Sequence, residues 1–144
     1  MRWLALDHGT KKLGLAFSDE LEILASPFEV WPMEERTLDR LVRLCREEGV
    51  QALCVGLPRH KDGAESATAP AARAFGEDLA GRTGLPLRFV NEHLTSAEAD
   101  RLLRERGVKS EKRKLLLDAA AAAVILRELL EERRAKGIPA ASLG

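Results

Sequence analysis

Three acidic residues occupy positions where a charged side chain is costly, and they are the first candidates for chemistry. Asp7 ends an apolar stretch and is followed by Gly9, and Glu92 stands in the same position after the apolar stretch 87–90. In open α/β sheets, ligands bind just beyond the carboxyl ends of the strands. Either acid taken alone is better explained as a loop cap or a solvated charge.

The third acid, Asp118, lies inside a helical pattern of apolar residues. Helical spacing places it on one stripe with Leu115, Ala122, Ile125 and Leu129, which we expect to face the sheet. A lone ionised carboxylate there would cost several kcal/mol, so it must stay protonated or find a cation. The cation could be a buried arginine or a metal ion, and a position at the wet margin of the packed face is a third alternative. The opposite face carries charged residues: Lys114, Arg127, Glu128 and Glu131.

If the three acids converge, they form a cluster of oxygen ligands. Such a cluster suits Mg²⁺ or Mn²⁺, which bind carboxylates and water. Two such ions a few ångströms apart can activate water and stabilise the leaving oxygen in phosphodiester cleavage. Sequence spacing leaves the convergence itself open.

The elements that must position these acids follow from the hydrophobic periodicity. The last long helix carries Asp118, and a box of Thr95 and Glu98 opens the helix before it. An antiparallel meander followed by two βα units predicts an α/β fold with a five-stranded mixed sheet flanked by helices. One domain spans residues 1–136, and residues 137–144 form a flexible C-terminal tail. The predicted strands are 3–7, 13–17, 26–31, 50–55 and 87–90, and the predicted helices are 33–48, 70–79, 95–106 and 111–135.

Composition excludes several classes of protein. The chain has 144 residues, and its 23 basic residues balance its 23 acidic ones, which argues against a uniformly basic nucleic-acid coat protein. No apolar run approaches the roughly 18 residues of a membrane span, and the N-terminal residues are too polar for a signal peptide. Cys45 and Cys54 fall at core-facing positions and are expected to be buried small hydrophobes. We therefore expect a soluble, cytoplasmic protein that does not associate with membranes.

The zero net charge conceals a basic segment between Arg101 and Asp118. Seven basic residues and three acidic ones occur there, directly before the acid of the last helix. A solvated helix face is one interpretation, and a track for the phosphates of a nucleic acid is the other. A turn at Gly9 and Thr10 could add backbone N–H groups and two lysines, although a plain hairpin turn explains it as well. The candidate nucleic-acid-binding residues are Lys11, Lys12, Arg101, Arg104, Lys112, Arg113 and Lys114, with His60 and Lys61 as weaker additions.

Four blocks of sequence together resemble the YqgF/RuvX family and occur in the family's order. They are Leu4-Ala-Leu-Asp7-His-Gly9-Thr10-Lys11-Lys12-Leu-Gly14, Val55-Gly-Leu-Pro58 with Asp62-Gly63, Asn91-Glu92-His93-Leu94-Thr95-Ser96, and Lys114-x-x-x-Asp118. The resemblance implies a ribonuclease H-like fold and a nuclease assigned to 16S rRNA 5′-end maturation or to Holliday junction resolution. Asp7, Glu92 and Asp118 match the family's catalytic and metal-binding acids. Asn91 and His93 depart from the usual Asp-Glu-Arg of the third block.

These observations predict a nuclease that uses Mg²⁺ or Mn²⁺ and acts on structured nucleic acid, with precursor 16S rRNA as the first candidate. A Holliday junction resolvase acting on branched DNA is the second candidate, and it should be a homodimer, because two symmetric cuts need two active sites. A ribosome-associated RNA-binding factor without catalytic activity is the third.

Overall fold

A computed structural model gives the arrangement of the chain and describes residues 1–58, 66–92 and 96–144. The order of its elements is β-β-β-α-β-α-β-α-α, as predicted. The strands are β1 (Trp3–His8), β2 (Lys12–Ser18), β3 (Ala25–Pro32), β4 (Ala52–Pro58) and β5 (Leu87–Glu92). The helices are α1 (Thr37–Glu47), α2 (Ala69–Thr83), α3 (Ser96–Glu105) and α4 (Ser110–Ala135).

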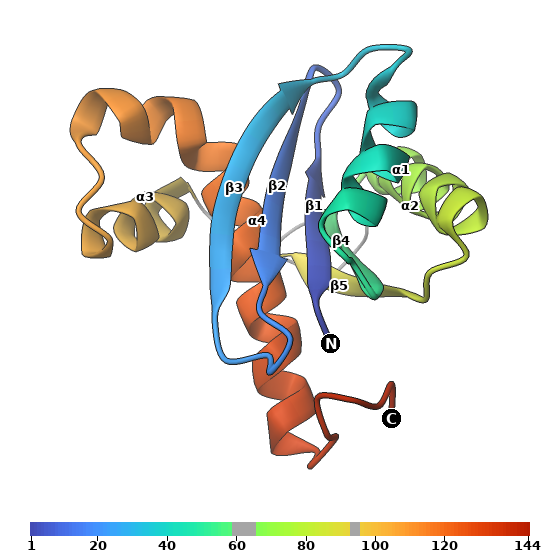
Figure 1. The fold of residues 1–144 in the computed structure, drawn as a ribbon. Coiled ribbons are helices and arrows are strands. Elements are labelled where there is room, and N and C mark those ends of the chain that lie inside the picture. The colour runs from blue at the N-terminus through green and yellow to red at the C-terminus, as the bar shows by residue number, and fades with distance from the viewer. Residues whose placement is uncertain (59–65, 93–95) are drawn as a thin grey trace.

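The five strands form one mixed sheet in the order β3-β2-β1-β4-β5 (Figure 1). β1 and β2 pair antiparallel, as do β2 and β3, while β4 pairs parallel with both β1 and β5. The hairpins account for the antiparallel half. The helical crossovers α1 and α2 account for the parallel half, because parallel neighbours need a long connection. The predicted five-stranded mixed sheet is confirmed.

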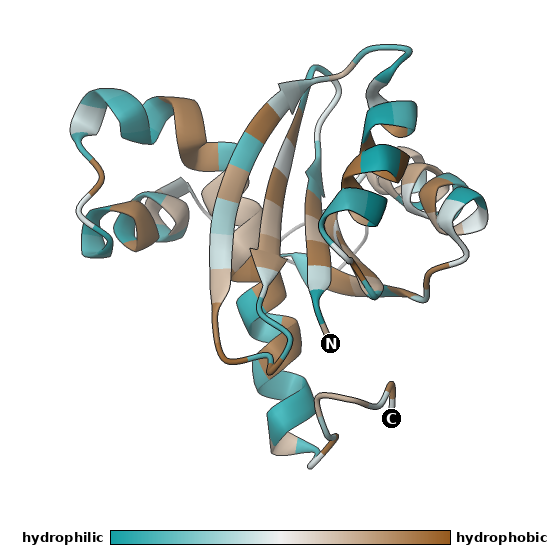
Figure 2. Ribbon diagram, viewed as in Figure 1, coloured by the Kyte–Doolittle hydropathy of each residue, from teal (hydrophilic) through white to brown (hydrophobic). Residues whose placement is uncertain are grey.

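Helices cover both faces of the sheet, so the sheet separates the hydrophobic core into two layers. α4 covers one face, where it packs on Trp3 and Ala5, and α3 packs on the outer side of α4. Leu4 and Leu6 point to the other face and pack under α1 and α2. Figure 2 shows brown, apolar positions along β1, β2 and β4 between these helical layers.

Element ends differ from the predicted ones by a few residues. α1 begins at Thr37 instead of 33, because residues 33–36 form a turn in which the Thr37 hydroxyl accepts from the Glu34 N–H. α2 continues to Thr83 and ends at Gly84, which takes the left-handed conformation with φ 71°. Thr95 of the predicted capping box lies outside the described residues.

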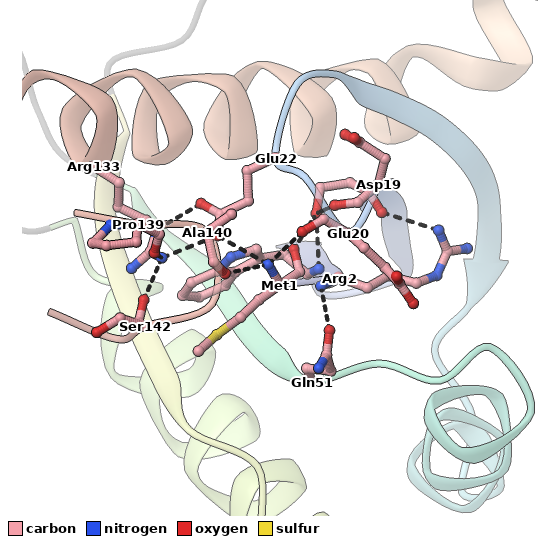
Figure 3. Close-up of polar contacts among 12 residues, drawn as sticks. Met1, Arg2, Asp19, Glu20, Glu22, Gln51, Arg133, Pro139, Ala140 and Ser142 are labelled. Carbon is pink, nitrogen blue, oxygen red and sulfur yellow. Dashed lines mark hydrogen bonds and ion pairs between the residues drawn. The ribbon is translucent and has the colours of Figure 1, made fainter. Parts of the chain in front are cut away.

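The C-terminal end of α4 is tied to the β2–β3 connection by a buried ion pair. Arg133 is 4% exposed, and its Nε donates to Glu22 Oε1 at 2.6 Å (Figure 3). Burial alone would raise the pKa of Glu22, but hydrogen bonds from Arg133 and the Met1 amino group outweigh burial and lower it. Arg133 also donates to carbonyl oxygens of Pro139 and Ser142 in the segment after α4. The flexibility of residues 137–144 stays a prediction.

Candidate active site

Asp7 lies at the carboxyl end of β1 and is flanked on both neighbouring strands by glycine. The alternation along β1 turns Asp7 to the same face as Trp3 and Ala5, the face that α4 covers. Asp7 pairs with Gly14 of β2, and Gly56 of β4 follows the residue that pairs with Leu6. Asp7 therefore has a residue without a side chain beside it on each neighbouring strand.

Gly14 allows α4 to pack closely against the sheet beside Asp7. A Cβ atom at this position would lie 1.9 Å from the carbonyl oxygen of Asp118 and 2.9 Å from the Ala119 nitrogen. No side chain fits in that space, so the helix backbone rests directly on β2. Because Gly14 and Asp7 are paired neighbours, this contact brings Asp118 next to Asp7.

Gly56 of β4 leaves space for the side chain of Glu92, the last residue of β5. A Cβ atom on Gly56 would lie 3.0 Å from Glu92 Oε2 and 2.5 Å from Ile125 Cδ1. The Glu92 carboxylate thus extends over β4, between its own strand and β1. Asp7 and Glu92 therefore lie at the same end of the sheet, at the carboxyl ends of β1 and β5.

The three acids interact electrostatically. Burial and the Asp118 carboxylate raise the pKa of Asp7 to about 7. Burial, Asp7 and Glu128 raise the pKa of Glu92 to about 8. Each shift follows from desolvation and from like charges held close together. Near neutral pH, Asp7 and Glu92 are therefore partly protonated when no cation is bound.

Glu128 is a neighbour of this site that the sequence analysis placed only on a solvated face. It is exposed, as expected, but it also lines a cavity of about 190 Å³ together with Glu92 and Glu98. Its position ten residues after Asp118 puts it almost three turns further along α4. This spacing alone does not place Glu128 near Glu92, because their proximity also depends on where α4 crosses β4.

The donor set suits a hard divalent cation, and the charge on the acids favours one. Across the described ranges, no three His, Cys, Asp or Glu side chains are grouped closely enough to hold a metal ion by themselves. Mg²⁺ is commonly bound by one or two carboxylates together with water and substrate phosphate. A cation beside Asp7 and Glu92 would relieve the repulsion that, together with burial, raises the pKa values of these two residues.

The sheet-facing stripe of α4 is confirmed for Ala122, Ile125 and Leu129 but is wrong for Leu115. Leu115 is 73% exposed. The first turns of α4 lie beyond the edge of the sheet, beside α3 (Figure 1), so no strand covers this side chain. Asp118, by contrast, is half-buried, and within the described residues it makes no ion pair with an arginine. The buried-arginine alternative therefore finds no support.

The sequence also singled out histidine, cysteine and asparagine residues besides the three acids. His8 points to the opposite face, where its ring centroid lies 4.9 Å from that of Phe75, and burial lowers its pKa. Cys45 and Cys54 are buried, as expected, and burial raises the pKa of both thiols. Asn91 is exposed at the end of β5, whereas His93 lies outside the described residues.

The basic segment divides into exposed cations and cations held by Asp100. Arg104 Nε lies 2.7 Å from Asp100 Oδ2, and Arg113 Nε lies 2.9 Å from Asp100 Oδ1. Arg113 also donates to the Val108 carbonyl, so its guanidinium links α3 to the start of α4. The remaining candidates are exposed: Lys11, Lys12, Arg101, Lys112 and Lys114. His60 and Lys61 lie outside the part of the chain that the structure describes.

The architecture is shared with Holliday junction resolvases of known structure. RuvC from Thermus thermophilus superposes with a TM-score of 0.61 at 18% identity, covering 94% of this chain and 97% of RuvC. The fowlpox virus resolvase, solved with Holliday junction DNA, superposes with a TM-score of 0.62 at 10% identity, covering 92% of this chain and 98% of the resolvase. At this level of identity the likeness defines the fold, which is the ribonuclease H-like fold predicted from the sequence.

Sequence comparison identifies the family. The profile described as "RuvX: Holliday junction resolvase" matches residues 1–132. A protein of Lachnospira eligens named "Putative pre-16S rRNA nuclease" is 40% identical over 93% of this chain and 99% of its own length. A protein of the same name from Dictyoglomus thermophilum is 39% identical over 91% of this chain and 96% of its own length. The chain belongs to the RuvX family. Among the described residues, no helix is long and apolar enough to cross a membrane.

Proposed function

We propose that this protein is a nuclease that requires a divalent metal ion and hydrolyses phosphodiester bonds in precursor 16S rRNA, in the cytoplasm. The observation that supports the proposal is the proximity of Asp7 to Asp118 and of Asp7 to Glu92, with the pKa values of Asp7 and Glu92 raised by burial and by these like charges. Family membership and the names of the relatives support the same activity.

Asp7, Glu92 and Asp118 would hold one or two Mg²⁺ or Mn²⁺ ions. When bound, such ions supply activation of water and stabilisation of the leaving oxygen. Asp7 lies between the other two acids, because the backbone of Asp118 packs over Gly14 and the carboxylate of Glu92 lies over Gly56. Glu92 and Asp118 approach it from β5 and α4, so a phosphate at the strand ends would meet carboxylates from three separate elements.

The reaction is hydrolysis with in-line attack on phosphorus. Water forms the new P–O bond, the bond from phosphorus to the 3′ oxygen breaks, and the products carry a 5′-phosphate and a 3′-hydroxyl. The exposed cations Lys112 and Lys114, on the first turns of the helix that carries Asp118, would bind the phosphates flanking the scissile one. Such contacts read backbone shape and not base sequence.

The test is incubation of purified protein with precursor 16S rRNA and with a four-way DNA junction, with and without Mn²⁺. We expect cleavage of the RNA that needs Mn²⁺ and is lost in Asp7→Asn, with 5′-phosphate ends on the mapped products. Symmetric cuts in the junction would instead favour a resolvase, the activity in the family's description. Binding without cleavage of either substrate would favour the RNA-binding factor and refute a nuclease.

A further inference from the structure

A groove runs between α3 and α4 and adjoins the candidate active site. Neighbouring cavities of about 190 and about 390 Å³ form it. The smaller cavity is lined by Glu92, and both cavities are lined by Glu98 of α3 and by Val124 and Arg127 of α4. The larger one falls within the range of roughly 300–1,000 Å³ that small-molecule sites occupy. We call this feature the α3–α4 groove, and it extends the site of the acids outward between the two helices.

Arginines from both helices line the groove without an acidic partner. Arg101 of α3 and Arg127 of α4 both line the larger cavity, and both are exposed. Over residues 1–58, 66–92 and 96–144, neither makes an ion pair or a side-chain hydrogen bond. Guanidinium groups bind phosphate through paired, charge-assisted hydrogen bonds. These guanidinium groups on facing helices are therefore suited to hold a phosphate.

Positive charge accumulates beside these arginines. Arg106, which directly follows α3, donates to the Ala25 carbonyl at 2.7 Å. Burial and the charge of Arg127 lower the pKa of Arg106, and the Glu105 carboxylate offsets only part of this effect. The guanidinium groups of Arg106 and Arg127 are therefore close enough to repel each other. A bound phosphate would relieve this repulsion, because an opposite charge nearby favours the charged form of each arginine.

Glu98 lies between the arginines and the acids of the candidate active site. It lines the cavity that contains Glu92 as well as the cavity that contains Arg101 and Arg127. A carboxylate repels phosphate but accepts a hydrogen bond from a hydroxyl, and RNA carries a ribose 2′-hydroxyl that DNA lacks. From the acids outward, the groove thus offers sites for a phosphate, a hydroxyl and a second phosphate. This is the order of phosphate, ribose and phosphate along an RNA strand.

We infer that the α3–α4 groove binds the ribonucleotide next to the scissile bond, with its 2′-hydroxyl on Glu98 and its outer phosphate on Arg101 and Arg127. The inference rests on the proposed nuclease function and adds the group by which the site distinguishes RNA from DNA. Lys114 lies on the other side of Asp118 along α4, about 20 Å from Arg127 at roughly 1.5 Å per residue. The strand would therefore be held on both sides of the acids.

Fluorescence anisotropy with a single-stranded RNA of about 12 nucleotides tests the arginines, in chelator so that no strand is cleaved. Arg101→Gln and Arg127→Gln should each weaken binding about tenfold, because each removes a charged donor to phosphate. Arg43→Gln, at an exposed arginine of α1, is the matched control and should bind as the parent does. Thermal melting of each variant verifies that the fold is intact. A parent chain that does not bind RNA overturns the inference, as do groove variants that bind as tightly as the parent.

A DNA strand of the same sequence tests the role of Glu98. The parent should bind RNA about tenfold more tightly than DNA, because only RNA donates a 2′-hydroxyl to the carboxylate. Glu98→Ala should remove most of this preference, whereas Arg127→Gln should weaken both strands alike. Glu77→Ala, at an exposed glutamate of α2, is the control and should keep the preference. Equal affinity of the parent for both strands, or a preference that Glu98→Ala leaves intact, contradicts the inference.

Cleavage with Mn²⁺ separates this inference from the proposed function. In a chain that cleaves RNA, Arg127→Gln should raise KM about tenfold and change kcat much less, because the acids stay in place. Normal cleavage that the groove variants leave unaltered would refute the groove and keep the nuclease. Groove variants that lose RNA binding, in a parent chain that cleaves no substrate, would support the groove and refute the nuclease.

Discussion

For Asp118, a catalytic role and a structural role predict opposite effects of a neutral substitution on cleavage and on stability. Asp118→Asn should abolish metal-dependent cleavage and leave the free energy of unfolding unchanged or about 1 kcal/mol higher, because it removes repulsion with Asp7. A carboxylate that stabilised the fold through a buried ion pair would instead cost about 3–5 kcal/mol when neutralised. Thermal melting in chelator, beside an activity assay, measures both quantities. A large loss of stability with residual cleavage would contradict the catalytic role.

Asp7 and Glu92 give the metal-free protein a specific dependence of stability on pH. Their pKa values in the folded chain, about 7 and about 8, lie above the ordinary values of 3.8 and 4.5, so the folded state binds more protons than the unfolded state between those limits. Their contribution to stability is therefore complete below about pH 4 and is lost as pH rises through 7–8.

Chemical unfolding in chelator should accordingly show stability falling by at least about 1 kcal/mol from pH 5 to pH 9. Asp7→Asn should flatten this dependence, and saturating Mg²⁺ should reduce it in the parent chain. Stability that rises over the same interval in the metal-free protein would show that the two carboxylates are not held in the environment described here.

At the level of secondary-structure elements, the close packing of α4 on β2 determines whether Asp118 lies near Asp7. Gly14→Ala should destabilise the fold by about 3 kcal/mol or more, since its Cβ would overlap the Asp118 carbonyl and force the helix away. The matched control is Gly81→Ala in α2, where nothing lies within 4 Å of the added Cβ. That substitution should stabilise by up to about 1 kcal/mol.

Urea unfolding of both variants measures the two changes. Cleavage at a temperature where Gly14→Ala stays folded should be reduced, because the displaced helix carries Asp118. Similar small effects at Gly14 and Gly81 would mean that α4 does not rest on β2 as closely as the geometry requires.

For the whole molecule, binding to nucleic acid depends on local charge, because the net charge is zero. We expect the parent chain to bind with a slope near three in a plot of log affinity against log salt, at roughly 0.7–0.9 per phosphate contact. Changing Lys109, Lys112 and Lys114 to Gln should lower that slope by about two and weaken all sequences alike. Arg113 is left in place, because it joins α3 to α4 through Asp100. An unchanged slope would assign the phosphates to Lys11 and Lys12.

Much of this architecture is readable from local sequence patterns. Alternation and helical spacing predicted the order of the nine elements, and the apolar run at 50–55 predicted a strand buried on both faces. The placement of Asp7 and Glu92 at strand ends followed from the same patterns. These features are local, because burial periodicity is set by backbone geometry over a few residues.

Other features depended on how elements cross. Leu115 belongs to the sheet-facing stripe of its helix by spacing, yet it is exposed because α4 extends past the sheet edge. Arg113 was indistinguishable in sequence from its lysine neighbours, and only the packing of α3 against α4 brings it to Asp100. Likewise, Gly14, predicted within a strand, and Gly56, predicted just after one, are the positions over which Asp118 and Glu92 approach Asp7.

The sequence by itself therefore determined the order and approximate bounds of the elements, the periodicity of their apolar faces, and which three acids are unusually placed. Only the tertiary structure decided that Asp118 and Glu92 both approach Asp7, that Glu128 lies near Glu92, and that apolar side chains stay exposed at the end of the sheet opposite Asp7. The physical reason is the sequence separation of the residues that interact. Periodicity is set within a single element, whereas crossing positions and exposed ends depend on packing between residues that are far apart in the chain.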